Sequence, residues 1–166
     1  EPVLELGKGA SFDCGTLPGS HCVLGERRDD RMTFFDLSPL TGKGKELCTI
    51  EGVRSGRLSP DGRRLALLEG SRGIRIASLA GVTEQRIEME TIPDRILKLA
   101  WSADGKGLFA VTAYGLTYTD LAGKATVLLH NPRELWVWDP VPSTDGRHLA
   151  FSGQKWQNNV WLLEGF

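Results

Sequence analysis

The sequence has no excess of charge of either sign and no long apolar run. Its 166 residues carry 20 Lys and Arg against 21 Asp and Glu, which gives a net charge of −1 at pH 7. Because a near-neutral chain lacks the basic surface that nucleic acids require, we expect no nucleic-acid partner. No apolar segment approaches the roughly 18 residues of a membrane span, and the first ten residues lack the basic and apolar regions of a signal peptide. We therefore expect no membrane contact by this segment.

Cysteine is scarce. The three cysteines, Cys14, Cys22 and Cys48, match no metal-site spacing, and an odd number cannot form a complete disulfide framework. We expect buried free thiols, because an unpaired cysteine packs as a small hydrophobic residue. The alternative is a Cys14–Cys22 bridge across a hairpin, which requires an oxidising compartment.

Signatures of catalysis and of cofactor binding are also missing. The sequence contains no G-x-S-x-G nucleophile motif and no glycine-rich phosphate loop that follows a strand and opens a helix. The histidines, His21, His130 and His148, lie far apart without the spacing of metal ligands. We therefore predict that the chain is not an enzyme and holds no metal and no cofactor.

What the sequence does contain is an internal repeat. A Ser-x-Asp-Gly motif opens the segments SPDGRRLALLEG at Ser59, SADGKGLFAVTA at Ser102 and STDGRHLAFSGQ at Ser143, at offsets of 43 and 41 residues. A degenerate copy, TLPGSHCVLGER at Thr16, lies 43 residues before Ser59 and has Pro18 in place of the aspartate. The units cover about residues 10–52, 53–94, 95–133 and 134–166.

Within each unit the apolar residues alternate with period two in runs of four to seven residues, as in Leu97, Leu99 and Trp101. This is a strand pattern, and no segment sustains a helical period. Four antiparallel strands in 41 to 43 residues match the blade of a β-propeller. We predict an all-β fold, with residues 1–166 forming one β-propeller domain of four repeats, each a four-stranded antiparallel blade.

The repeats carry a family resemblance. SPDGRRLALLEG, AWSADGKGLFAV and STDGRHLAFSGQKWQNNVWLLE resemble WD40-like repeats of TolB-type β-propellers and of the propeller of prolyl oligopeptidases. The ending NNVWLLEGF is similar to the C-terminal end of propeller domains in bacterial winged-helix regulators and serine/threonine kinases. The resemblance implies a propeller fold and indicates little about function.

The repeated motif has a structural explanation. Asp or Ser at the start of a turn accepts hydrogen bonds from backbone amides, and Gly takes a positive φ that reverses the chain. We expect these residues to form the first hairpin turn of each blade: Asp61, Gly62, Asp104, Gly105, Asp145 and Gly146.

Two segments are candidates for ligand or partner binding. Trp156 lies beside Lys155, Gln157 and Asn158 in a long loop of the last repeat, where an amphipathic ring and adaptable polar groups suit a binding surface. Arg28 and Asp29 lie in an ERRDDR hairpin, for which a solvated ion-pair loop is the simpler interpretation.

Closure of the ring has two interpretations. If Val3–Leu6 pairs beside Val160–Leu163, strands from both ends complete the last blade and close a four-blade ring. Alternatively, the chain is half of a larger ring, completed by a second copy in a homodimer or by further blades. The bulky inner strands favour the larger ring, because four blades leave a cramped centre.

Two classes of function follow. The first is a non-catalytic binding or sensory module that recognises a protein, a peptide or a small ligand as part of a larger bacterial regulatory protein, as the resemblance implies. The second is the accessory propeller of a prolyl-oligopeptidase-like enzyme whose catalytic domain lies outside this sequence. The compartment is underdetermined; an extracytoplasmic domain of a membrane-anchored bacterial protein is slightly favoured over a cytoplasmic one.

Overall fold

The structure is a computed structural model that describes residues 7, 9–89, 95–130 and 135–155. In these ranges every regular element is a strand, and the strands form antiparallel sheets. Three of the sheets are four-stranded, each with its strands in sequence order. We name these sheets blade 1, blade 2 and blade 3, and the following two-stranded sheet blade 4. The all-β, propeller-type prediction is thereby confirmed.

The strand bounds follow the repeat. Blade 1 contains β1 (Ala10–Cys14), β2 (Cys22–Arg28), β3 (Arg31–Ser38) and β4 (Gly42–Glu51). Blade 2 contains β5 (Val53–Leu58), β6 (Arg64–Glu69), β7 (Gly73–Ser78) and β8 (Thr83–Glu88). Blade 3 contains β9 (Lys98–Trp101), β10 (Gly107–Thr112), β11 (Gly115–Asp120) and β12 (Ala125–His130). Blade 4 contains β13 (Leu135–Pro142) and β14 (Leu149–Lys155).

Burial of the strands depends on their place in the blade. The second strand of blade 2, β6, is buried along its centre on both faces, whereas the outermost strand β8 exposes all but one of its residues. A strand whose two faces are both covered by neighbouring sheets has apolar residues at successive positions, as in the β6 sequence RLALLE. A strand exposed to solvent is mostly polar, as in the β8 sequence TEQRIE. The position of a strand in the blade therefore explains its sequence.

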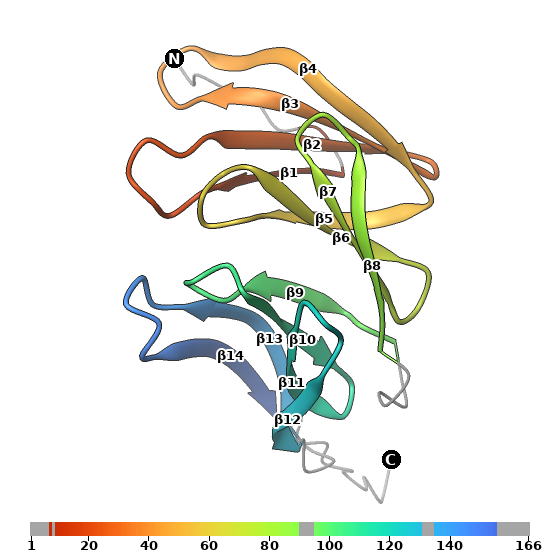
Figure 1. Ribbon diagram of the computed structural model, residues 1–166, viewed down its shortest axis with the longest axis vertical. Helices are drawn as coiled ribbons and strands as arrows, with labels where there is room; N and C mark the ends of the chain where they lie inside the picture. Colours follow the sequence, from red (N-terminus) through yellow and green to blue (C-terminus); the bar gives the residue numbers. More distant parts are fainter. Residues whose placement is uncertain (1–6, 8, 90–94, 131–134, 156–166) are drawn as a thin grey trace, which may run out of the picture.

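The apolar core consists of layers between neighbouring blades. One layer joins blades 1 and 2 and includes Phe34 and Leu67; a second joins blades 2 and 3 and includes Ile76 and Leu108. A smaller third layer joins blades 3 and 4 through Val137. Figure 1 shows blade 1 at the top of the molecule, blade 2 below it, and blades 3 and 4 beside each other in the lower half. Face-to-face packing of successive sheets is the arrangement of a propeller.

The two interpretations of ring closure stay predictions. Val3–Leu6 and Val160–Leu163, the proposed closing strands, lie outside the described residues.

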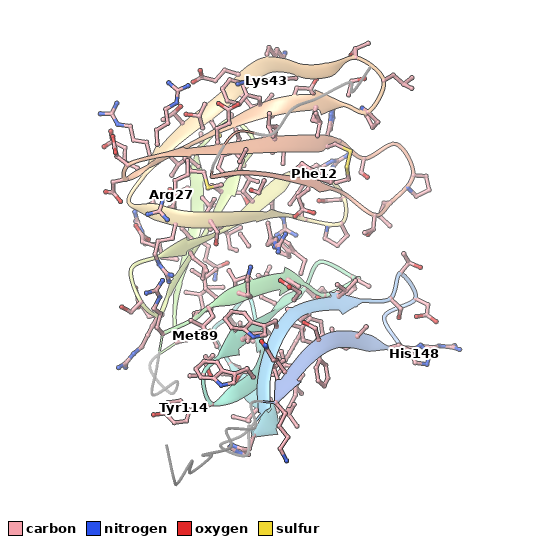
Figure 2. The ribbon with its side chains drawn as sticks, turned by 180° about the vertical axis from the view of Figure 1, so that it is seen from behind. Phe12, Arg27, Lys43, Met89, Tyr114 and His148 are labelled. Carbon is pink, nitrogen blue, oxygen red and sulfur yellow. A yellow bond between two sulfur atoms is a disulfide. The ribbon has the colours of Figure 1, made fainter. Side chains whose placement is uncertain are left out.

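The expectation for two of the cysteines was wrong. Cys14 at the end of β1 and Cys22 at the start of β2 form a disulfide, visible in Figure 2, whereas Cys48 is a buried free thiol. The two bonded cysteines stand directly opposite each other in the β1–β2 register. The odd number of cysteines favoured free thiols, because three cysteines cannot all be paired. Two of them can still form a disulfide when they stand opposite each other on neighbouring strands, and the third then stays a free thiol.

Candidate binding cavity at the inner strands

The Ser-x-Asp-Gly motif forms the turn between the first and second strands of blades 2, 3 and 4. In blade 3, Ser102 Oγ donates to Asp104 Oδ1 at 2.7 Å and accepts from the Gly107 amide at 3.0 Å. Asp104 Oδ1 also accepts from the Lys106 amide at 3.0 Å, and Gly105 has φ of 67°. The turns at Ser59 and Ser143 repeat these serine–aspartate contacts, each at 2.5 Å. The predicted turn residues therefore organise the backbone at one end of three blades.

The first strand of each sheet lies against the first strand of the next, so β1, β5, β9 and β13 are the inner strands. Hydrogen bonds cross between them at one-repeat intervals. The Leu58 amide donates to Asp13 Oδ2 at 2.9 Å, which joins blades 1 and 2. Arg57 Nε donates to the Leu99 carbonyl at 3.2 Å, and Trp101 Nε1 donates to the Arg57 carbonyl at 2.9 Å, which joins blades 2 and 3. Polar side chains thus fix the relative positions of the inner strands.

A cavity of about 200 Å³ lies where these strands end. All four blades contribute to its wall: Asp13 from β1, Arg57 from β5, Trp101 from β9, and Asp139 and Val141 from β13. The apolar part of the wall is completed by three prolines, which are Pro60, Pro140 and Pro142. Because its lining comes from every inner strand, the cavity lies toward the axis around which the blades are arranged.

The charges around the cavity are partly compensated. Burial raises the pKa of the Asp13 carboxyl above its ordinary value, while the hydrogen bond from Leu58 and the charge of Arg57 act in the opposite direction. Asp139 lies 3.5 Å from the ammonium group of Lys98 in a solvent-exposed ion pair. Asp139 also has a positive φ of 45°, at an irregularity in the β13–β14 pairing. The cavity therefore combines an apolar wall with carboxylates at its edge.

Two further hollows lie on the same side of the molecule. One, between blades 3 and 4, is lined by Asp104, Tyr118 and His148; the other, between blades 1 and 2, is lined by His21 and Asp61. In Figure 2, His148 in the β13–β14 connection lies on the side opposite Tyr114 in the β10–β11 connection. The cavity and the two hollows therefore lie on the side of the molecule that carries the connections between first and second strands, which we call the turn side.

Three of the predicted binding residues lie in the described ranges, and none of these three lines the cavity. Arg28 ends β2 and Asp29 follows it in an exposed hairpin of blade 1, where the Asp29 carbonyl accepts from Arg27 Nε at 3.2 Å. Lys155 ends β14 in blade 4, and Figure 1 shows these two blades at opposite ends of the molecule. The other predicted residues, Trp156, Gln157 and Asn158, lie outside the described ranges.

Sequence reasoning missed the residues that do line the cavity. In the sequence, Trp101 is distinguished only as a member of an apolar strand, and Asp13 lies in the least regular repeat. The Asp139-Pro140 pair is a signal that could have been used, because such a pair marks an interruption of a strand. Which of these residues share a cavity depends on contacts between repeats more than 40 residues apart.

Among the described residues, no group of three or more His, Cys, Asp or Glu side chains is placed to hold a metal ion. Within the same ranges, no helix has the length and apolar character to cross a membrane.

Comparison with known proteins supports the fold. Among solved structures the chain is similar to the crystal structure of TolB from Acinetobacter baumannii, with a TM-score of 0.66 and 17% sequence identity. The match covers 95% of this chain and 41% of the TolB chain. No family model matches the sequence, and no curated protein matches it. At this level of identity the similarity shows the fold, a TolB-type β-propeller.

Proposed function

We propose that the chain is a non-catalytic binding module that receives a side chain of a protein or peptide partner in the cavity at its inner strands. The observation that carries this proposal is the cavity itself, which is lined by the inner strands of all four blades and opens among the ordered turns.

The size of the cavity favours a protein or peptide over a small-molecule ligand. Pockets that enclose drug-sized ligands measure roughly 300–1,000 Å³, and this cavity measures about 200 Å³. Binding between proteins commonly depends on a few anchor side chains that fill desolvated pockets. The Trp101 ring, Val141 and the three prolines suit an apolar anchor, while Arg57 and Asp139 at the wall offer hydrogen bonds to the backbone beside it.

The disulfide supports an oxidising compartment. Disulfides persist outside the reducing cytosol, and the Cys14–Cys22 bond holds the β1–β2 connection whose Leu17 amide donates to the Pro60 carbonyl of blade 2 at 3.0 Å. An extracytoplasmic location, as part of a larger bacterial regulatory protein, is consistent with both the disulfide and the resemblance of the repeats.

The test uses a displayed random peptide library as the probe. Peptides enriched on the wild-type chain are measured against Val141→Arg, which places a charged side chain at the cavity wall, and against Val82→Arg as a matched control. Both valines are exposed, at 60% and 64%, but Val82 lies in the β7–β8 connection, away from the cavity lining. We expect Val141→Arg to weaken binding at least about tenfold and Val82→Arg to leave it unchanged. Failure to enrich peptides, or equal binding by both variants, contradicts the proposal.

A further inference from the structure

The hollow between blades 3 and 4 lies at the blade boundary where blade 3 lacks a side chain that blade 2 has. The fifth residue after the turn serine is Arg64 in blade 2, Gly107 in blade 3 and His148 in blade 4. These positions are structurally equivalent, because the backbone amide of each residue donates to its own turn serine, at 2.9, 3.0 and 3.0 Å. Glycine at this position of blade 3 therefore replaces the arginine of blade 2.

The Arg64 side chain fills the boundary between blades 2 and 3. Its Nη2 donates to the Gly105 carbonyl of blade 3 at 3.1 Å, and its guanidinium lies 5.0 Å from the centroid of the Trp101 ring. A Cβ on Gly105 would lie 3.6 Å from Arg64 Nη2 and 3.9 Å from the Pro60 ring. A guanidinium from the preceding blade thus occupies the space beside this turn glycine.

The equivalent space at the boundary between blades 3 and 4 is open. Gly146 is the counterpart of Gly105, with a φ of 69° against 67°. A Cβ on Gly146 would lie 3.6 Å from Ala103, the counterpart of Pro60, and apart from its chain neighbours no other described residue comes within 4 Å. A hollow of about 520 Å³, lined by Gly146 and Ala103, lies in the place of the arginine.

Aromatic rings and a turn carbonyl suit this hollow to a guanidinium. The rings of Phe109 and Tyr118 line it, with their centroids 5.5 Å apart. Aromatic rings attract cations, so these two rings stand in for Trp101, whose counterpart in blade 4 is Pro142. The carbonyl of Gly146 is the counterpart of the Gly105 carbonyl that accepts from Arg64.

The charges of the wall also favour a cation. Asp104 and Asp145 both line the hollow. Hydrogen bonds from the turn serines lower the pKa of both carboxyls, so both are negatively charged at neutral pH. Arg147 and His148 complete the rim, and both side chains are exposed to solvent. Two carboxylates therefore face one guanidinium of the chain itself.

We infer that this hollow binds the guanidinium group of an arginine side chain from the protein or peptide partner. Blade 2 shows which group fits the position, because a turn carbonyl and an aromatic ring hold Arg64 there. The hollow shares Ala103, Pro142 and Thr144 with the cavity at the inner strands, so one partner can fill both. The inference rests on the proposed function and adds an arginine as a second anchor beside the side chain in the cavity.

The first test uses acetyl-arginine methylamide as the probe and acetyl-citrulline methylamide, its neutral isostere, as the control. Backbone amide shifts in NMR titrations report where each probe binds and how tightly. We expect the arginine probe to shift the signals of Gly146 and His148 and to bind at least about fivefold more tightly than the citrulline probe, because charged hydrogen bonds are the stronger ones. Equal binding of the two probes, or shifts confined to other parts of the chain, overturns the inference.

Two charge variants test the sign of the site with the same probe. Arg147→Ala removes the cation at the rim and should tighten binding by about twofold to fivefold. Asp104→Asn removes a carboxylate and should weaken binding by a similar factor. The controls are Arg63→Ala and Asp61→Asn, which change the equivalent residues of blade 2 outside the lining of this hollow and should leave binding unchanged. Weaker binding by Arg147→Ala contradicts a guanidinium site.

The inference and the proposed function can fail separately. Peptides enriched for the cavity, together with equal binding of the two small probes, would overturn the arginine site and leave the proposed function intact. Selective binding of the arginine probe without any enriched peptide would support the arginine site and contradict the proposed function.

Discussion

The indole Nε1 of Trp101 donates a hydrogen bond of 2.9 Å to the backbone carbonyl of Arg57, across the boundary between blades 2 and 3. A second hydrogen bond joins the same two strands in the opposite direction: Arg57 Nε donates to the carbonyl of Leu99, which lies on the strand that carries Trp101. The guanidinium of Arg64 lies 5.0 Å from the Trp101 ring centroid. One tryptophan therefore joins two repeats and forms part of the cavity wall.

Trp101→Phe tests the hydrogen bond. Phenylalanine keeps an aromatic ring but leaves the Arg57 carbonyl without its donor, and we expect a loss of about 1–3 kcal/mol in the free energy of unfolding. Urea denaturation followed by circular dichroism measures the loss. Trp136→Phe, on a ring that is 40% exposed, serves as the matched control and should cost less. Equal losses in the two variants would show that the Nε1–carbonyl contact is not stabilising.

Gly62 and Gly105 occupy equivalent turns but have different surroundings. Both have positive φ, of 71° and 67°, so alanine at either position is strained by about 1–2 kcal/mol. A Cβ on Gly62 would also lie 2.7 Å from the His21 amide nitrogen of blade 1, whereas a Cβ on Gly105 meets nothing closer than 3.6 Å. We expect Gly62→Ala to lower the melting temperature more than Gly105→Ala does. A larger decrease for Gly105→Ala would contradict the close packing of the Gly62 turn against His21 of blade 1.

The Asp104 carboxyl should titrate below its ordinary pKa. The hydrogen bond from Ser102 and the backbone amide of Lys106 lower the pKa of Asp104 below 3.8. A depressed pKa stabilises the fold above pH 3.8, and this contribution disappears as the pH falls through the folded-state value. The chemical shift of the Asp104 carboxyl carbon in an NMR pH titration measures this pKa. Ser102→Ala should raise the pKa of Asp104 and leave that of Asp145, which Ser143 lowers, unchanged.

Removal of the disulfide should destabilise the domain. The bond joins residues separated by eight positions, and closure of so short a loop stabilises a fold by about 2–3 kcal/mol. We expect Cys14→Ser/Cys22→Ser to lose about that amount in urea denaturation. A thiol assay of the unreduced, unfolded wild-type chain should find one free thiol per chain and find three after reduction. Three thiols before reduction would refute the bond.

Cys48 should react slowly in the folded chain. Burial and the nearby Glu46 carboxylate raise the pKa of the Cys48 thiol from 9.0 to about 11. Because the thiolate is the nucleophile, alkylation by iodoacetamide at pH 8 should be on the order of a hundredfold slower than in urea. Mass spectrometry of timed samples measures the rate. Similar rates in the two conditions would contradict the burial of this side chain.

The sequence by itself determined the repeat and the strands. Alternating apolar residues and the Ser-x-Asp-Gly turns are local signals, and the turns at Ser59, Ser102 and Ser143 close through contacts within five residues. Such signals depend on the pleat of a strand and on backbone hydrogen bonding, which nearby residues control. They suffice for an all-β propeller unit and for the positions of its hairpins.

Only the tertiary structure decided the composition of the cavity and the pairing of the cysteines. The wall of the cavity joins Asp13, Arg57, Trp101 and Asp139, which come from four different repeats. The pairing of Cys14 with Cys22 depended on the β1–β2 register. Periodicity shows that a strand has two faces but not which neighbour each one meets, because that choice depends on how successive sheets pack. That Trp136 and Phe12 are exposed became evident only when the order of the blades was known.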